Sequence, residues 1–135
     1  MIPEDAPTIL VAEDERDMRR LLERRLTRKG YRVVGIGDGM TLRTYLRACL
    51  AGQEGDRVPD LLVSDIDMPG LDGLEALRGV PDAAWRLPTI FVTGMANPPS
   101  AELAQSVGAH AVLRKPIDFE ELFATIERLL GASKR

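Results

Sequence analysis

Five short apolar runs, each followed by a longer amphipathic segment, constrain the fold of this chain more than any other feature. The runs cover residues 8–12, 32–36, 60–64, 88–92 and 110–114. Most are continuously hydrophobic rather than alternating, which is typical of parallel strands covered on both faces. Five strand–helix units fill residues 8 to 131, and right-handed crossovers then predict an open parallel sheet with helices on both sides.

The segments between the runs have the spacing of helices. Apolar residues recur at helical intervals from Met18 to Leu26, and Gly30 follows as a C-terminal stop. A second stripe ends before Gly52, a third segment over 71–79 is short, and a fourth over 101–107 is the weakest. The last helix is the best specified, because Asp118 can cap it and a buried stripe runs to residue 130.

Length and composition exclude several classes of protein. With 135 residues and 44% hydrophobic residues, the chain is one globular domain with a core. It has no apolar run of membrane-spanning length and no signal-peptide pattern at its start, so we expect a soluble cytoplasmic protein. Its single cysteine and single histidine rule out an internal disulfide and a Cys- or His-rich metal site.

Charge is distributed unevenly along the chain. The formal net charge is -3, which gives no general attraction to nucleic acid. Residues 16–32, however, hold eight basic and two acidic side chains, a net charge of +6. This segment is either a solvated helix face or a docking face for an acidic partner.

Reactive polar residues end four of the five runs. Glu13 and Asp14 follow the first run, Asp65 follows the third, Thr93 the fourth and Lys115 the fifth. Ligands of open parallel sheets bind at the carboxyl ends of the strands, so these side chains are expected to converge. Clustered carboxylates suit Mg²⁺, and together with a lysine and a hydroxyl they can stabilise a phosphoryl group in transfer. An Asp carboxylate can itself be the nucleophile that forms an acyl phosphate.

The motifs around these residues resemble the receiver domain of two-component response regulators. They are Val11–Glu15, the Asp-x-x-Met-Pro-Gly-x-Asp-Gly stretch within Pro59–Gly73, Phe91–Gly94 and Leu113–Pro116. The resemblance covers about residues 7 to 131 and implies a flavodoxin-like, doubly wound five-stranded sheet of order 2-1-3-4-5. Short tails are expected at 1–6 and 132–135, with no output domain after them, so the protein is expected to be either a stand-alone regulator or a receiver cut from a longer chain.

The resemblance assigns roles to the converging residues. Asp65 is the expected phosphoacceptor, Thr93 is expected to bond a phosphoryl oxygen, and Lys115 is expected to pair with the phosphoryl group. The Lys115–Pro116 bond is expected to be cis, which would help to aim the lysine. The protein is then a signalling phosphoacceptor and not an enzyme, apart from its own phosphorylation and dephosphorylation.

The same resemblance implies a Mg²⁺ cofactor. Asp14 is expected to coordinate the metal directly, Glu13 mostly through water, and Asp67 through its backbone carbonyl. Asp65 is expected to belong to the same metal site. The first acidic position holds Glu13 where Asp is commoner in the family, which a water-mediated role tolerates.

Two other positions depart from the family pattern. Val112 stands where an aromatic residue often turns inward on activation, so an aromatic rotamer switch cannot operate. Movement of the 94–100 loop and the following helix is expected instead. Met95, two residues after Thr93, cannot orient an attacking water, which predicts slow hydrolysis of the acyl phosphate.

The resemblance also predicts partners. A sensor histidine kinase or histidine phosphotransfer protein is expected to meet the first helix. The fourth helix, fifth strand and fifth helix are expected to form the output or dimer surface, without direct nucleic-acid binding or membrane insertion.

Two other functions remain open from the sequence. A haloacid-dehalogenase-like phosphatase also uses an Asp-x-Asp nucleophile, but there the motif normally closes the first strand rather than the third. A receiver-like interaction module that never takes phosphate is the second, and the intact set of acids, Thr93 and Lys115 argues against it. His110 opens a strand and is expected to be structural.

Overall fold

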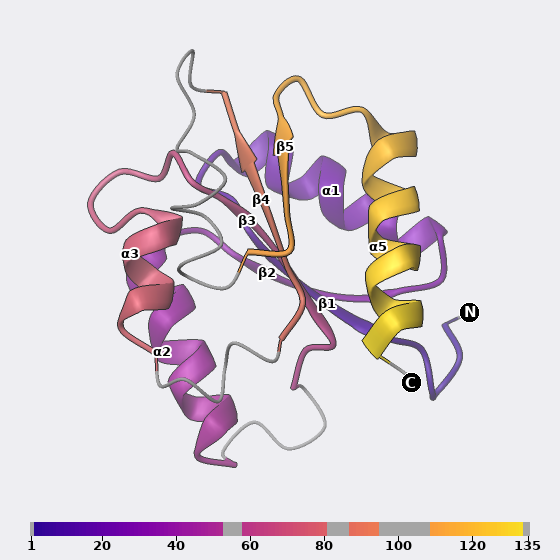
Figure 1. Ribbon diagram of the computed structural model, residues 1–135, viewed down its shortest axis with the longest axis horizontal. Coiled ribbons are helices and arrows are strands. Elements are labelled where there is room, and N and C mark those ends of the chain that lie inside the picture. The colour runs from indigo at the N-terminus through magenta and orange to yellow at the C-terminus, as the bar shows by residue number, and fades with distance from the viewer. Residues whose placement is uncertain (1, 53–57, 81–86, 95–108, 134–135) are drawn as a thin grey trace.

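A single parallel sheet forms the centre of the protein (Figure 1). The computed structural model describes residues 2–52, 58–80, 87–94 and 109–133. The strands are β1 (Thr8–Ala12), β2 (Arg32–Ile36), β3 (Leu61–Asp65), β4 (Thr89–Thr93) and β5 (Ala111–Arg114). Their order, β2-β1-β3-β4-β5, confirms the predicted flavodoxin-like topology.

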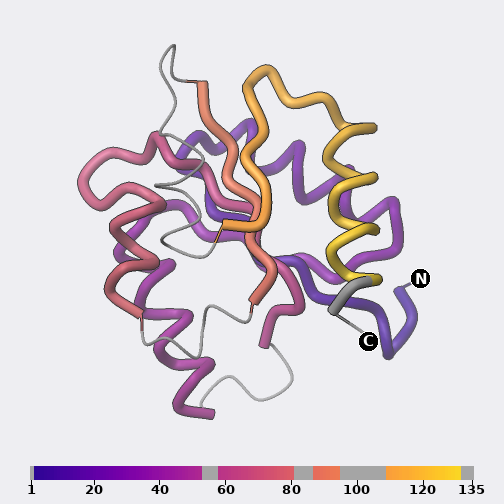
Figure 2. Tube along the Cα trace, in the orientation of Figure 1, coloured from indigo at the N-terminus to yellow at the C-terminus, as the bar shows by residue number. Residues whose placement is uncertain are grey.

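Helices cover both faces of this sheet. The described helices are α1 (Arg16–Arg28), α2 (Gly39–Leu50), α3 (Gly73–Arg78) and α5 (Phe119–Ser133). In Figure 1, α1 and α5 lie on one side of the sheet, and α2 and α3 lie on the other. Figure 2 follows the chain from indigo β1 to yellow α5, which returns to the side of α1. The predicted helix over 101–107 and Met95 lie outside the described residues, and α5 continues past residue 131.

Alternate residues of the strands point to opposite faces of the sheet and pack into two separate hydrophobic cores. On the α1 and α5 side, Ile9 and Val11 of β1 belong to a buried cluster with helix residues such as Leu22, Leu26, Leu122 and Ile126. On the other side, Leu10 and Ala12 belong to a cluster with Leu42, Leu46, Leu74 and Leu77 of α2 and α3. Because both faces of each central strand are covered, the strands are apolar throughout, as the sequence predicted.

The helix ends follow from local side-chain and glycine chemistry. Gly30 and Gly52 have positive φ angles of 96° and 75° after α1 and α2, as expected of residues that stop a helix. The Asp118 carboxylate accepts backbone hydrogen bonds from Glu120 and Glu121, which confirms the predicted cap of α5. The sequence analysis missed the reciprocal capping box of α3, in which Asp72 and Glu75 each bond the other's backbone amide.

Candidate functional site

The carboxyl ends of four strands bring the predicted polar residues to one edge of the sheet. Glu13 directly follows β1, Asp65 and Thr93 are the last residues of β3 and β4, and Lys115 directly follows β5. The parallel register keeps these ends level, since Asp65 pairs with Val92 and Thr93 pairs with Arg114. The predicted convergence of these side chains is therefore present.

Lys115 lies between two buried carboxylates. Its Nζ atom donates to Oδ2 of Asp65 at 2.8 Å and to Oε1 of Glu13 at 3.2 Å. The side chains of Glu13 and Asp65 are only 2% and 3% exposed, whereas that of Lys115 is 26% exposed. Such a pairing is expected, because a carboxylate that is removed from water needs a countercharge or hydrogen bonds.

Three carboxylates are close enough to hold one metal ion. Ligand oxygens of Glu13, Asp14 and Asp65 all lie within 4.8 Å of one another. Glu13 and Asp65 are buried and Asp14 is exposed, so the cluster is open to solvent on one side. An all-oxygen, partly hydrated site of this kind fits a hard cation such as Mg²⁺, which retains several waters.

Electrostatics in the cluster favour a proton on Glu13 when no cation is bound. Burial, followed by the hydrogen bond and charge of Asp65, raises the pKa of Glu13 to about 7. Burial alone would lower the pKa of Lys115, but its hydrogen bond to Asp65 and the charges of Asp65 and Glu13 raise it overall. The lysine is therefore fixed as a cation, and Glu13 is the group that titrates near neutral pH.

Backbone contacts hold the acidic loop after β1. The Glu13 amide donates to the carbonyl of Ile36 at 2.9 Å, and its carbonyl accepts from the Arg19 guanidinium at 2.9 Å. Arg19 lies over the end of β2, and a Cβ on Gly37, the residue after this strand, would be 3.0 Å from its Nη1 atom. Gly37 has no side chain and so leaves room for this arginine, which nothing in the sequence indicates.

Asp67 forms hydrogen bonds with residues at the ends of both β3 and β4. Its amide donates to Oδ1 of Asp65 at 2.9 Å. Its carboxylate accepts from the Thr93 hydroxyl, at 3.2 Å to each oxygen, and from the Gly94 amide at 2.8 Å. Asp67 was expected to act only through its backbone carbonyl, and nothing in the sequence indicates these side-chain contacts.

Two smaller predictions concern residues at the two ends of β5. The Lys115–Pro116 peptide bond is cis, as expected. His110 accepts a hydrogen bond from the Thr89 amide at its Nδ1 atom, at 3.2 Å. This contact ties β5 to β4 and supports the structural role predicted for His110.

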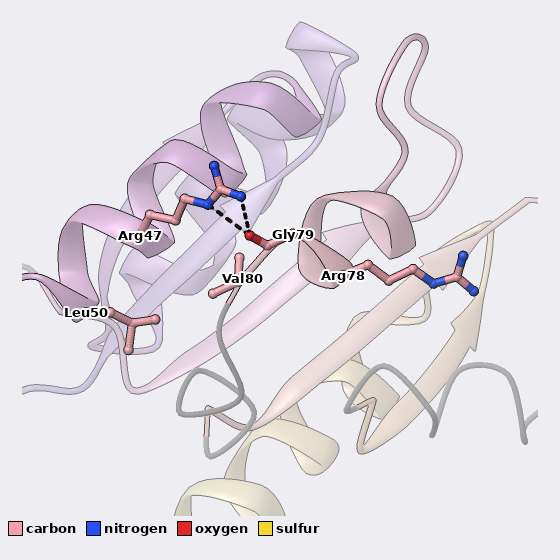
Figure 3. A pocket seen from close by; sticks show the side chains of 5 residues that line it. All are labelled: Arg47, Leu50, Arg78, Gly79 and Val80. Carbon is pink, nitrogen blue, oxygen red and sulfur yellow. Dashed lines mark hydrogen bonds between the residues drawn. The ribbon is translucent and has the colours of Figure 1, made fainter.

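A separate cavity of about 520 Å³ lies at the C-terminal ends of α2 and α3 (Figure 3). Its arginines do not converge. The Arg47 guanidinium donates to the carbonyl of Gly79 at 2.8 and 2.5 Å, whereas Arg78 points away from this contact. Arg47 thus satisfies a carbonyl at the end of α3, and the cavity shares no residue with the acidic cluster.

Among the described helices, none combines the length and the apolar character that a membrane span requires.

Comparisons with known proteins agree with this geometry. Residues 9–127 match the family described as "Response regulator receiver domain". The chain is 33% identical to the C4-dicarboxylate transport transcriptional regulatory protein DctD of Pseudomonas aeruginosa, covering 95% of this chain and 26% of DctD. It is 34% identical to the DNA-binding transcriptional regulator NtrC of Salmonella typhimurium, covering 91% of this chain and 24% of NtrC. The chain therefore spans about a quarter of the length of these two relatives.

A solved structure with a similar fold is the receiver domain of the sensor histidine kinase PA1611 from Pseudomonas aeruginosa. The TM-score is 0.77 at 26% identity, over 93% of this chain and 98% of that one. That structure has a magnesium ion coordinated in its active site cleft. With the family match over residues 9–127, these findings establish that the chain belongs to the response regulator receiver domains of two-component systems.

Proposed function

We propose that this receiver domain accepts a phosphoryl group on Asp65 with the help of Mg²⁺ and thereby changes its affinity for a partner. The observation that carries the proposal is the position of Lys115, which bonds Asp65 at 2.8 Å within a cluster of three acids. Phosphoryl transfer to a carboxylate requires positive charge beside the nucleophile. Here a lysine ammonium and a group of metal-binding carboxylates lie beside the buried carboxylate of Asp65. The receiver unit is proposed to be residues 7–131.

The proposed reaction is a displacement at phosphorus. An oxygen of Asp65 attacks the phosphorus of a phosphohistidine, or of a small donor such as acetyl phosphate. A new O–P bond forms, the bond from phosphorus to the donor breaks, and the donor leaves with the electron pair of that bond. The imidazole or acetate so released takes up a proton according to its own pKa, and Asp65 becomes an acyl phosphate.

Mg²⁺ is proposed to be held by Glu13, Asp14 and Asp65, with the backbone carbonyl of Asp67 as a further ligand. When bound, the ion neutralises charge on the phosphoryl oxygens and on the acids. Lys115 supplies a second positive charge on the side of β5. The Thr93 hydroxyl is a donor at the end of β4 and is proposed to bond a phosphoryl oxygen.

Signalling then requires that phosphorylation shift an existing equilibrium between two conformations. The phosphoryl group can do so only if Thr93 and Lys115 interact with it differently in the two conformations. Val112 is partly buried beside the α2 and α3 core and carries no ring, so the response is proposed to be a movement of the backbone after β4. The output or dimer surface is proposed to include β5 and α5.

The exposed arginines of α1 are proposed to meet an acidic face of the kinase or phosphotransfer protein. Not all basic residues of the segment are available for this. Arg25 lies 4.3 Å above the ring of Phe119, and Lys29 lies 4.8 Å from that of Phe123, so both pack against α5. Arg19 bonds the acidic loop.

Exposed positions on α1 remain for docking, at Arg16, Arg20, Arg24 and Arg28. Changing Arg20 and Arg24 to Glu should slow transfer from a phosphorylated partner but leave labelling by acetyl phosphate unaltered. Equal slowing with both donors would contradict the docking role. The location is proposed to be cytoplasmic, in keeping with a sequence that has a single cysteine.

Labelling with acetyl phosphate tests the proposed function. With Mg²⁺ present, the wild type should gain one phosphoryl group by mass spectrometry, and Asp65→Asn or removal of Mg²⁺ with EDTA should abolish the gain. No labelling of the wild type would contradict the proposal. Steady turnover of p-nitrophenyl phosphate would instead favour the haloacid-dehalogenase-like alternative, for which the comparisons offer no support.

A further inference from the structure

Two glycines at the end of β2 leave a groove on the side of the sheet that α1 covers. Successive residues of a strand point to opposite faces, so positions 33, 35 and 37 share one face. Val33 packs in the core beneath α1 and α5, which identifies that face. A Cβ on Gly35 would overlap with the carboxylate of Glu23, and a Cβ on Gly37 would approach the guanidinium of α1 described above. Side chains of α1 therefore occupy the space that the two glycines leave.

The Arg19 guanidinium lies in this groove between two acceptors. Its Nε atom is 3.9 Å from Oε1 of Glu23, one helical turn further along α1. Its Nη1 atom donates to the carbonyl of Glu13 at 2.9 Å. The Arg19 side chain is 24% exposed, so the groove shields most of it from water. Because a guanidinium is planar and its donors are fixed relative to one another, a shift of Arg19 within the groove takes the donor away from the carbonyl.

The carbonyl that Arg19 bonds belongs to the peptide group between two of the clustered acids. Glu13 and Asp14 each contribute an oxygen to the cluster with Asp65. A peptide group is planar, so the direction of its carbonyl limits how the backbone leaves the first acid and enters the second. The amide of Glu13 is held separately, by the carbonyl of Ile36 at 2.9 Å. The acidic loop is thus anchored by the backbone of β2 on one side and by Arg19 on the other.

We propose that Arg19, seated over Gly37, positions the carboxylates of Glu13 and Asp14 for a divalent cation, and that this requires a residue without a side chain at position 37. Arg19 is a positioning residue, since it bonds a backbone carbonyl and not a carboxylate of the cluster. Such residues alter metal affinity by orienting the ligands. The inference rests on the proposed function, because it takes Mg²⁺ to bind at this cluster, and it extends the metal site to the edge strand β2.

Calorimetric titration of the metal-free protein with Mg²⁺ compares two alanine substitutions in the groove. Gly37→Ala should weaken binding by about threefold to tenfold, because the added methyl group displaces the guanidinium from the Glu13 carbonyl. Gly35→Ala is the matched control, since its methyl group displaces Glu23 and lies 3.5 Å from Cδ of Arg19, an ordinary contact. It should change the affinity by less than about twofold, because a half-exposed ion pair contributes little. Equal weakening by the two substitutions would be a general effect of a methyl group at this end of β2 and would overturn the proposal.

A double substitution tests whether Gly37 acts through Arg19. Arg19→Ala should weaken Mg²⁺ binding about as much as Gly37→Ala does, since both remove the same hydrogen bond. The protein with both substitutions should then bind as weakly as either single variant, within about twofold. Losses that multiply in the double variant would mean that Gly37→Ala distorts the strand itself, and they would overturn the proposal.

NMR of the metal-free proteins adds a readout that is independent of the metal. The Asp14 amide shares its peptide group with the Glu13 carbonyl, so its ¹H and ¹⁵N shifts should move in Arg19→Ala and Gly37→Ala but not in Gly35→Ala. An Asp14 amide that stays in place in the first two variants would overturn the proposal. These two variants lose the bond by different routes, so each tests the proposal alone if the other does not fold.

The same titrations separate this inference from the proposed function. If the wild type binds Mg²⁺ and takes a phosphoryl group, but neither Gly37→Ala nor Arg19→Ala weakens Mg²⁺ binding, the positioning role fails and the proposed function stands. If the wild type binds no Mg²⁺ and takes no phosphoryl group, both fail.

Discussion

The Nζ atom of Lys115 lies 2.8 Å from Oδ2 of Asp65, and the same ammonium lies 3.2 Å from Oε1 of Glu13. One cation thus serves two carboxylates that are almost fully buried. Without it, Asp65 and Glu13 would repel each other in a poorly solvated site. The charges of the cluster are therefore interdependent, and the removal of one partner should alter the others.

Replacing Lys115 by Met should destabilise the metal-free protein and impair phosphorylation. We expect a loss of about 2 kcal/mol in unfolding free energy, since two buried acids lose their shared cation. Labelling by acetyl phosphate should fall at least about tenfold, because a charge that faces the phosphoryl group is lost. Urea unfolding and mass spectrometry measure the two effects.

Lys29→Met is the matched control for this substitution. It removes the lysine at the C-terminal cap of α1, whose ammonium lies 4.8 Å from the centroid of the Phe123 ring. Labelling should be unaltered, and the unfolding free energy should change by less than about 1 kcal/mol. Equal loss of labelling in the two variants would contradict a local role for Lys115.

The stability of the metal-free protein should depend on pH through Glu13. Its pKa is about 7 in the folded protein, against an ordinary value of 4.5, so the folded state binds the proton more tightly than the unfolded state. Stability from this group is therefore present below pH 4.5 and is lost as the pH rises through 7. The loss is on the order of 2 to 3 kcal/mol.

Urea unfolding in EDTA between pH 4.5 and 8.5 measures this dependence. Glu13→Gln, which cannot ionise, should remove most of the decline, and the difference between the two proteins cancels other titrating groups. Mg²⁺ should bind more tightly as the pH rises through 7, because the ion competes with a proton for Glu13. Parallel pH profiles for the two proteins would refute this assignment.

Arg19→Ala should weaken Mg²⁺ binding, although Arg19 is not itself a metal ligand. The arginine donates to the Glu13 carbonyl at 2.9 Å, and its loss would free the acidic loop after β1. We expect affinity to fall by about threefold to tenfold, in line with other residues that orient metal ligands. Calorimetric titration with Mg²⁺ checks this, with the exposed Arg20→Ala as the control. A similar loss in Arg20→Ala would indicate a general charge effect instead.

Gly73→Ala should displace the backbone of Asp65 and so distort the site. A Cβ at Gly73 would lie 2.5 Å from the carbonyl oxygen of Asp65 and 2.9 Å from Oγ of Ser64, so the end of β3 must shift. We expect a loss of about 1 to 3 kcal/mol in stability together with reduced labelling.

Gly131→Ala in α5 is the control for the glycine substitution. It has no heavy atom within 4 Å of the added Cβ and lies in a helix, so it should be neutral or stabilise by up to about 1 kcal/mol. If Gly73→Ala behaved like Gly131→Ala, the close approach at Asp65 would be wrong.

The sequence predicted the fold well because its strongest signals are local. Strands buried on both faces must be apolar throughout, and residues 8–12 and 88–92 display this plainly. The polar residues that follow such strands had to converge, since parallel strands end at a common edge. The cluster of Glu13, Asp14 and Asp65 was therefore predictable before any distance was known.

The contacts that the sequence did not predict depend on side-chain directions across the fold. Arg19 is separated from Glu13 by one helical turn and a loop, and only the orientation of α1 brings its guanidinium to that carbonyl. Asp67 and Thr93 are 26 residues apart, and either could equally have faced solvent. The capping box of α3 could have been predicted from the sequence, because Asp72 and Glu75 have the required spacing.

Mapping the phosphorylated residue shows whether Asp65 is the phosphoacceptor. The protein is incubated with acetyl phosphate and Mg²⁺ and digested, and the peptide that carries the phosphoryl group is sequenced by mass spectrometry. We expect one hydroxylamine-sensitive phosphoryl group on Asp65, absent from Asp65→Asn. A phosphoryl group on any other residue, or undiminished labelling of Asp65→Asn, would contradict it.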